Sequence, residues 1–275
     1  MTSMRVGIVG TGEMGRPLID RLLDAGHSVT SYARRPEVRE ELSVAGVVVV
    51  DEVNAIAVGS DVVIIYVFTD EQVRQVVLDD GVLAAMEPRS TLVLHTTGSP
   101  KTAIEIAEIA ATRNVVVVDA PGTGGPANVA NGTLTLFVGA NQGALEHIQP
   151  LFACYADRVV HFGPVGSGQR MKLLNNLLFG AHVQFAVEVG RLCTAMELDE
   201  QLVLQTLHGS SGGSSVLDMA SAAGSSSMLL ELAGRFVHKD VAVARQLATE
   251  IGVDLGTLEV VTRNIFEFTS DRSET

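Results

Sequence analysis

Short runs of apolar, mostly β-branched residues alternate with amphipathic stretches over residues 5–162. The runs lack an in/out alternation of apolar and polar positions, which is typical of strands buried on both faces of a parallel sheet. The stretches between them, such as Met14–Ala25 and Lys101–Thr112, have helical spacing. The predicted strands are Arg5–Val9, Ser28–Tyr32, Val47–Val50, Asp61–Val67, Thr91–Leu94, Val115–Val118, Thr133–Val138 and Arg158–Phe162. The pattern predicts an α/β domain with a mostly parallel, doubly wound sheet wrapped by helices.

The pattern changes after Gly163-Pro164. From Gln169 to about Glu197 the chain has no proline and only two glycines, and its apolar residues recur at helical spacing. Val237–Ile251 and Leu255–Phe268 show the same spacing. We therefore predict an α/β domain over residues 1–163 and an all-α domain over residues 164–275, which a long helix links.

Composition excludes several classes of function. The chain has 275 residues, 47% of them hydrophobic, and a formal net charge of −13, so it can bury a large core and repels phosphate backbones. No apolar run approaches the roughly 20 residues of a membrane span, and the first residues lack the apolar segment of a secretion signal. Cys154 and Cys193 match no metal-binding spacing. We expect a cytoplasmic protein with no nucleic-acid partner, no membrane partner and no metal.

One glycine-rich segment stands in the context that a dinucleotide site requires. The strand Arg5–Val9 runs into a G-x-G-x-x-G turn that opens a predicted helix. The first glycine permits the bend, the second lets a pyrophosphate approach the backbone, and the third lets helix and strand pack closely. The helix N-terminus adds N–H donors. The residues expected to bind the cofactor here are Gly10, Thr11, Gly12, Glu13, Met14 and Gly15.

The end of the second predicted strand bears on the choice between NAD and NADP. A site that prefers NAD places Asp or Glu there to hold the ribose hydroxyls. This chain has Ala33, followed by Arg34 and Arg35. Because a guanidinium fork suits a phosphate, the pattern favours NADP(H) over NAD(H). The alternative is two solvated arginines ahead of a helix.

Four motifs, in order along the chain, resemble those of the β-hydroxyacid dehydrogenases. This family includes 3-hydroxyisobutyrate dehydrogenase, tartronate semialdehyde reductase and the glyoxylate/succinic semialdehyde reductases, and has a 6-phosphogluconate dehydrogenase-like NAD(P)-binding domain. The motifs are residues 10–17 with 26–27, residues 119–126 with 132–134, residues 166–176, and Lys239-Asp240 at the expected start of a late helix. The resemblance implies an N-terminal α/β Rossmann domain followed by an all-α domain. It also implies hydride transfer between NADP(H) and a small anionic β-hydroxy acid or its semialdehyde.

The resemblance also implies roles for individual residues. Lys172 is then the general acid/base, and Asn176, one helical turn later, contacts the substrate. Thr123 binds the substrate carboxylate together with the backbone N–H groups of Gly124 and Gly125. The further cofactor contacts that we expect are Val67, Phe68, Thr97 and Lys239.

The rarity of lysine in the chain also favours a chemical role for Lys172. Only three of the 19 basic residues are lysines, and Lys172 and Lys239 both stand in motifs. A lysine desolvated in a cleft can release a proton, whereas arginine stays protonated. Lys172 and Asn176 share a helix face because they are i and i+4. The alternatives are a packed helix lysine at 172, an ion-pairing lysine at 239 and a structural turn at Thr123.

Two other functions remain compatible with this organisation. Imine reductases share the architecture but typically lack the catalytic lysine, so Lys172 argues against them. A non-catalytic dinucleotide-binding or interaction module would not need Lys172, Asn176 and Thr123, so the presence of these residues argues against it. Two departures from the family concern the substrate pocket: Gly122-Thr123 replaces Val-Ser, and Leu94-His95 stands where Asp-Met is frequent.

Several other features have structural explanations. Residues 209–227, rich in Ser and Gly, predict a loop with helix N-caps, or else a mobile flap. We expect packing for His27, and packing or a ligand contact for His95. For Asp119 we expect a structural role at least as much as a functional one. We expect Asp240 to cap its helix. The long helix predicts a homodimer or homotetramer, as in the family.

Overall fold

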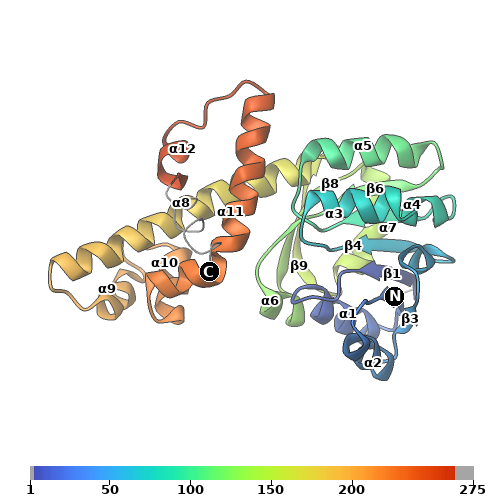
Figure 1. Cartoon of the computed structure of the whole chain (residues 1–275), viewed down its shortest axis with the longest axis horizontal. Helices are drawn as coiled ribbons and strands as arrows, with labels where there is room; N and C mark the ends of the chain where they lie inside the picture. The colour runs from blue at the N-terminus through green and yellow to red at the C-terminus, as the bar shows by residue number, and fades with distance from the viewer. Residues whose placement is uncertain (1–2, 264–275) are drawn as a thin grey trace. The chain divides into compact units, whose positions relative to one another are not determined.

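The chain divides into two compact units, Met1–Lys172 and Leu173–Thr275. A computed structural model describes residues 3–263. The first unit contains the sheet and the second is helical (Figure 1), so the predicted fold class is confirmed. The division falls inside the long helix α8 (Ser167–Ala195). The domain boundary near Gly163 stays a prediction.

The first unit is built on one nine-stranded sheet, ordered β3-β2-β1-β4-β5-β6-β8-β7, with β9 beside β8. The strands from β1 to β6 pair in parallel. Strand β8 runs antiparallel to β6 and β7 and parallel to β9. The bounds are β1 (Arg5–Val9), β2 (Ser28–Tyr32), β3 (Val48–Val50), β4 (Val62–Ile65), β5 (Thr91–Leu94), β6 (Val116–Asp119), β7 (Gly122–Thr123), β8 (Leu134–Gly139) and β9 (Ala156–Gly163). The two-residue strand β7 escaped the sequence analysis because it contains no apolar run.

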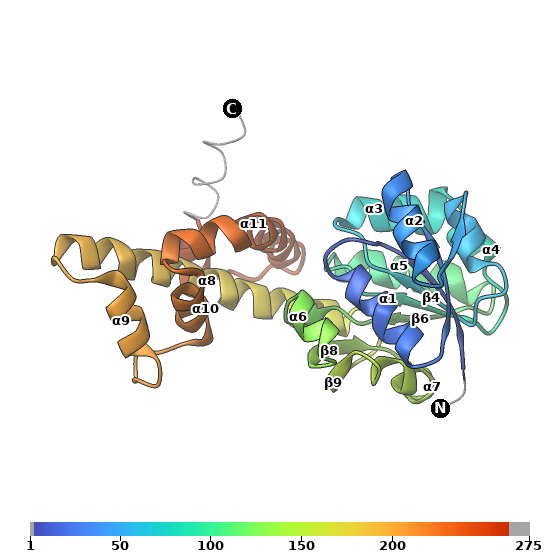
Figure 2. The same cartoon turned by 90° about the horizontal axis from the view of Figure 1, so that it is seen from below.

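Both faces of the sheet are buried. Val62 and Ile64 of β4 point into one apolar cluster, and Val63 and Ile65 point into another. The elements that close the first cluster are α1 (Gly15–Asp24), α2 (Pro36–Val44), α6 (Pro126–Ala130) and α7 (Gln142–Phe152). Those that close the second are η1 (Val53–Ala57), α3 (Asp70–Arg74), η2 (Gln75–Asp79), α4 (Val82–Ala85) and α5 (Pro100–Ala111). Figure 2 shows these helices around the sheet. Burial on both faces explains the continuous apolar runs of the central strands.

The second unit contains helices only in its described part. Helix α8 packs on α11 (Ser226–Glu250) through a cluster that includes Leu173, Leu177 and Val241. A second cluster joins α8 to α9 (Glu200–Leu207), α10 (Ser215–Ala223) and α11. A short helix, α12, spans Thr257–Thr262. No helix within residues 3–263 has both the length and the apolarity needed to cross a membrane.

Two expectations about the helical unit were wrong. Helix α11 begins at Ser226 rather than near Val237, so Lys239-Asp240 lies in mid-helix. Residues 209–227 also contain α10, which their composition does not predict because Ser and Gly are weak helix formers. The predicted N-caps are confirmed: Ser214 and Ser225 accept hydrogen bonds from the first turns of α10 and α11. Of the predicted helix Leu255–Phe268, residues 264–268 lie outside the described residues.

Candidate active site

The loop between β1 and α1, residues 10–15 and called the glycine cradle below, has a backbone geometry suited to a phosphate group. Gly10 has a φ of +115°, and a Cβ there would lie 2.1 Å from the carbonyl oxygen of Tyr66. A Cβ on Gly15 would lie 1.7 Å from the carbonyl oxygen of Gly10, whereas one on Gly12 would meet nothing within 4 Å. Two glycines thus permit close packing, and the third leaves the backbone open at the N-terminus of α1. This geometry fits a dinucleotide pyrophosphate. Thr11 and Met14 are half-buried, and Glu13 is exposed.

Two exposed arginines follow β2. Ala33 is buried, and Arg34 and Arg35 are exposed beyond it. Arg35 Nε lies 3.7 Å from Glu37 Oε1. Arg39 donates to the carbonyl oxygen of Ala33 over 3.3 Å, which helps hold the turn that presents the two arginines. The turn therefore offers two exposed guanidinium groups and no carboxylate at position 33.

Two loops that carry predicted cofactor contacts are hydrogen-bonded to each other. Thr96 Oγ1 accepts from the backbone N–H of Val67 over 2.9 Å and donates to the carbonyl oxygen of Val67 over 3.0 Å. The structure therefore brings Val67 and Phe68 beside the segment of Thr97. The Phe68 side chain is 43% exposed, and Thr97 is half-buried.

The second motif forms a strand and a tight turn. Half-buried Thr123 ends β7, opposite Thr135 of β8. Gly124 has a φ of +124°. The backbone N–H of Gly125 donates to Asn128 Oδ1 over 3.0 Å, an interaction that sequence reasoning missed. A carboxylate contact from Gly125 therefore requires that the Asn128 side chain give way.

The start of α8 is anchored by Asp119, the last residue of β6. Its two carboxylate oxygens accept the backbone N–H groups of Gly166, over 2.6 Å, and Gln169, over 2.8 Å. Burial raises the pKa of Asp119 to about 6, although these hydrogen bonds oppose the rise. Half-buried Lys172 lies one turn after Gln169, as the last residue of the first unit.

In the helical unit, Asp240 joins two predicted site residues. Buried Asn176 donates from Nδ2 to one carboxylate oxygen of Asp240. The other oxygen lies 2.6 Å from Lys239 Nζ. The expected capping role of Asp240 is wrong, because a mid-helix residue has no N-terminal N–H groups to cap. Lys172 belongs to the first unit, whereas Asn176 and Lys239 belong to the second.

The two histidines considered in the sequence are part of the core. His95 Nδ1 lies 2.5 Å from the carbonyl oxygen of Ala120, and Nε2 lies 2.9 Å from the hydroxyl of Tyr155. Nδ1 therefore carries the proton and Nε2 accepts. Burial lowers the pKa of His95 to about 4. His27 is buried and accepts the backbone N–H of Met4 over 3.1 Å.

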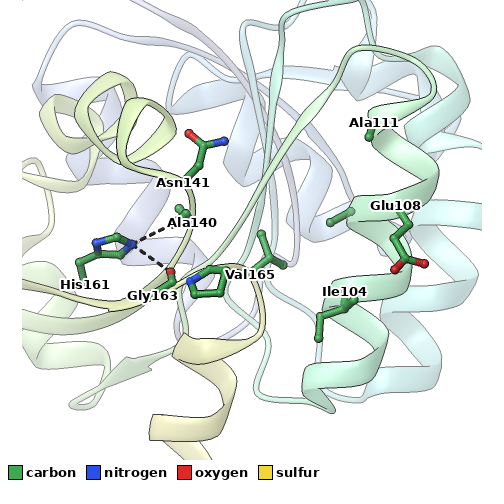
Figure 3. A pocket seen from close by; sticks show the side chains of 10 residues that line it. Ile104, Glu108, Ala111, Ala140, Asn141, His161, Gly163 and Val165 are labelled. Atoms are coloured by element: carbon green, nitrogen blue, oxygen red, sulfur yellow. Dashed lines mark hydrogen bonds between the residues drawn. The ribbon is translucent and has the colours of Figure 1, made fainter.

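A groove of about 710 Å³ lies elsewhere on the first unit. His161 Nε2 on its rim contacts the carbonyl oxygens of Ala140 and Gly163, over 2.8 and 2.9 Å (Figure 3). Its lining contains none of the predicted site residues and consists of Ile104, Ala107, Glu108, Ala111, Ala140, Asn141, His161, Gly163, Pro164 and Val165. Within residues 3–263, no group of three His, Cys, Asp or Glu side chains could hold a metal ion.

Comparisons with known proteins cover both units. Residues 5–163 match the NAD binding domain of 6-phosphogluconate dehydrogenase, and residues 166–273 match a domain described as NAD-binding of NADP-dependent 3-hydroxyisobutyrate dehydrogenase. The chain is 32% identical over 216 residues to the NAD-dependent L-serine dehydrogenase of Pseudomonas aeruginosa, covering 78% of this chain and 72% of that protein. It is 28% identical over 270 residues to the 2-(hydroxymethyl)glutarate dehydrogenase of Eubacterium barkeri, covering 96% and 89%.

A solved structure shares the fold. The 3-hydroxyisobutyrate dehydrogenase of Mycobacterium tuberculosis, solved with L-serine, matches with a TM-score of 0.86 at 24% identity. The match covers 98% of this chain and 95% of that one.

Proposed function

Because this chain belongs to the β-hydroxyacid dehydrogenase family, we propose that it transfers a hydride between NADP(H) and a small β-hydroxy acid or its semialdehyde. NAD(P)-dependent oxidation or reduction of hydroxy acids is the activity of this family. The observation that carries the proposal is that one compact unit contains both the open glycine cradle and Lys172. The relatives from P. aeruginosa and E. barkeri, whose names are those of hydroxy-acid dehydrogenases, support a small anionic substrate.

The preference for NADP(H) rests on the turn after β2. The P. aeruginosa relative is NAD-dependent by name, so the preference depends on this chain's own residues. Ala33 offers no carboxylate to the ribose, and Arg34 and Arg35 offer positive charge. Gly10–Gly15 would hold the pyrophosphate, while Val67, Phe68, Thr97 and Lys239 would contact the cofactor further along. When bound, the nicotinamide ring supplies or accepts the hydride.

Lys172 has the central role in the proposed mechanism. During reduction, negative charge develops on the substrate carbonyl oxygen, and the Lys172 ammonium stabilises that charge and then donates a proton to it. During oxidation, neutral Lys172 accepts the hydroxyl proton. Asn176 orients the substrate, and its hydrogen bond to Asp240 fixes its amide group.

Thr123, with the turn that follows it, binds the substrate carboxylate in this proposal. Thr123→Ala should raise KM for acid substrates far more than for an aldehyde that lacks the carboxylate, and Thr123→Ser, which keeps the hydroxyl, serves as the control. An equal rise in KM for both substrates would make Thr123 a structural residue.

The activity is tested by following NADPH consumption with glyoxylate, tartronate semialdehyde, succinic semialdehyde, methylmalonate semialdehyde and a cyclic imine. We expect turnover with at least one of the carbonyl acids. Turnover of the cyclic imine alone would identify an imine reductase. NADPH binding without turnover of any compound would favour a non-catalytic module.

The family resemblance and α8 together support a homodimer or homotetramer. Leu174, Leu178, Phe185, Leu192 and Met196 are exposed large hydrophobic side chains. At 3.6 residues per turn the first four fall on one narrow face of α8, which ends at Ala195, one residue before Met196. Phe185→Glu should lower the mass measured by light scattering, whereas an unchanged mass would place the interface elsewhere. A cytoplasmic location stays a prediction.

A further inference from the structure

The Gln169 side chain connects the first turn of α8 to the loop after β5. It is 2% exposed. Its Nε2 donates to the carbonyl oxygen of Thr96 over 2.8 Å, and its Oε1 accepts the backbone N–H of Gly98 over 3.0 Å. A side-chain amide offers a donor and an acceptor together, so both ends of Gln169 are used on the two residues that flank Thr97.

The turn that carries Gln169 is itself held firmly. Asp119 accepts the backbone N–H groups of Gly166 and Gln169. A Cβ on Gly168 would lie 2.3 Å from the carbonyl oxygen of Phe137, so helix and sheet meet without a side chain between them. The axial and rotational setting of this turn relative to β6 and β8 is therefore fixed.

The loop is held from its other side as well. Asp70 accepts the backbone N–H of Ser99 over 2.9 Å and the hydroxyl of Thr102. Thr96 Oγ1 adds its two hydrogen bonds to Val67. Gln169 thus connects α8 to a loop that is already hydrogen-bonded to Asp70 and Val67. The Gln169 side chain can therefore set the position of this loop relative to the first turn of α8.

We propose that Gln169 is a positioning residue, which sets the turn that carries Lys172 relative to the loop that carries Thr97. The inference rests on the proposed function, in which Lys172 transfers the substrate proton and Thr97 contacts the cofactor. Lys172 follows Gln169 by three residues, so the two are neighbours on the helix surface. A misplacement of about 1 Å in a reacting group can lower a rate by about 100-fold.

The primary test compares Gln169→Leu with the wild type, and Gln184→Leu is the matched control, since Gln184 is also buried on α8. For Gln169→Leu we expect kcat to fall about 10- to 100-fold, by a larger factor than the affinity for NADPH, because the glycine cradle is untouched and only the Thr97 contact is disturbed. Gln184→Leu should retain kcat. A wild-type kcat in Gln169→Leu, or an equal loss in the control, would overturn the proposal.

A second variant separates positioning from a general loss of stability. A protonated glutamic acid has one O–H donor and one carbonyl acceptor, so it can restore both hydrogen bonds. Burial and the nearby Asp119 carboxylate should raise the pKa of a glutamate at this position. The kcat of Gln169→Glu relative to wild type should therefore rise as the pH falls, while the Gln169→Leu ratio stays flat. Parallel ratios for both variants would contradict the positioning role.

Amide hydrogen exchange tests the link without enzymatic activity. The Gly98 N–H should exchange slowly in the wild type and faster in Gln169→Leu, with Gln184→Leu like wild type. Faster exchange in Gln169→Leu, combined with no wild-type turnover of any substrate, would refute the proposed function and leave the link intact. Unchanged exchange at Gly98 would refute the link itself.

Discussion

The two units contain different examples of how a buried polar side chain finds its partner. In the α/β unit, Ser31, Thr96 and Gln169 bond to backbone groups at or near strand ends. In the helical unit, Asn176 and Asp240 bond to each other across two helices, and Lys239 pairs with Asp240. Backbone groups at the ends of parallel strands occupy predictable places, whereas a side-chain pair exists only once two helices have packed. Backbone-directed contacts of this kind therefore follow more directly from the strand pattern than such side-chain pairs do.

Removal of Lys172, where the α/β unit ends, should have the largest effect. Lys172→Ala should lower kcat by about 10²- to 10⁴-fold, the usual loss on removal of a positioned acid/base, while NADPH still binds. Lys172→Arg should recover little, because arginine keeps the charge but does not exchange the proton. Lys101→Ala, at an exposed position on α5, is the control. A near-normal kcat in Lys172→Ala would show that the lysine only packs.

The buried core of the α/β unit should give two opposite pH dependences of stability. The pKa of His95 falls from 6.5 to about 4, so its contribution is present above pH 6.5 and is lost as the pH falls toward 4. The pKa of Asp119 rises from 3.8 to about 6, so its contribution is present below pH 3.8 and is lost as the pH rises through 6. Each amounts to about 3 kcal/mol.

Urea unfolding between pH 4 and 7 measures both effects. Relative to wild type, His95→Phe should gain stability as the pH falls, and Asp119→Asn should gain it as the pH rises. Curves parallel to wild type for either variant would show that the group titrates alike in the folded and unfolded chain.

The cofactor preference should depend on the arginines after β2. A bidentate charged contact contributes about 1.5–3 kcal/mol, or about 10- to 150-fold in affinity. Arg34→Ala combined with Arg35→Ala should lower kcat/KM for NADPH by that factor and leave the value for NADH unchanged. Arg158→Ala, an exposed arginine on β9, controls for net charge. Equal use of both cofactors by the wild type, unaltered in the variant, would remove the basis of the preference.

The smallest expected effect probes the side-chain pair of the helical unit. Asn176→Ala deprives buried Asp240 of a donor and should lower the free energy of unfolding by about 1–3 kcal/mol. Ser31→Ala, which removes a backbone-directed hydrogen bond in the α/β unit, should cost only about 0.5–1.5 kcal/mol. If the two variants unfolded at the same urea concentration, the contrast between the units would have no energetic basis.

The sequence by itself determined the strands of the parallel sheet, the glycine cradle and the long helix. The strand Arg5–Val9 and its glycine turn could be predicted because their geometry follows from local sterics: an apolar run buried on both faces, then positions without room for a Cβ. The serine caps in the segment 209–227 could also be predicted, because a cap depends only on the side chain and the helix turn that directly follows it. The offset from β2 was enough to predict that Ala33, Arg34 and Arg35 lie directly after this strand. Their role in cofactor choice stays a prediction.

Only the tertiary structure decided which polar groups meet. Nothing near Asp119 in the sequence indicates that it holds a helix 47 residues later, or that Asn128 occupies the Gly125 N–H. Lys239-Asp240 suggested a helix start because an acidic residue commonly begins a helix, yet packing of α11 on α8 buried Asp240 against Asn176. A buried polar atom needs a partner, and that partner is set by how distant segments pack, which local sequence does not encode.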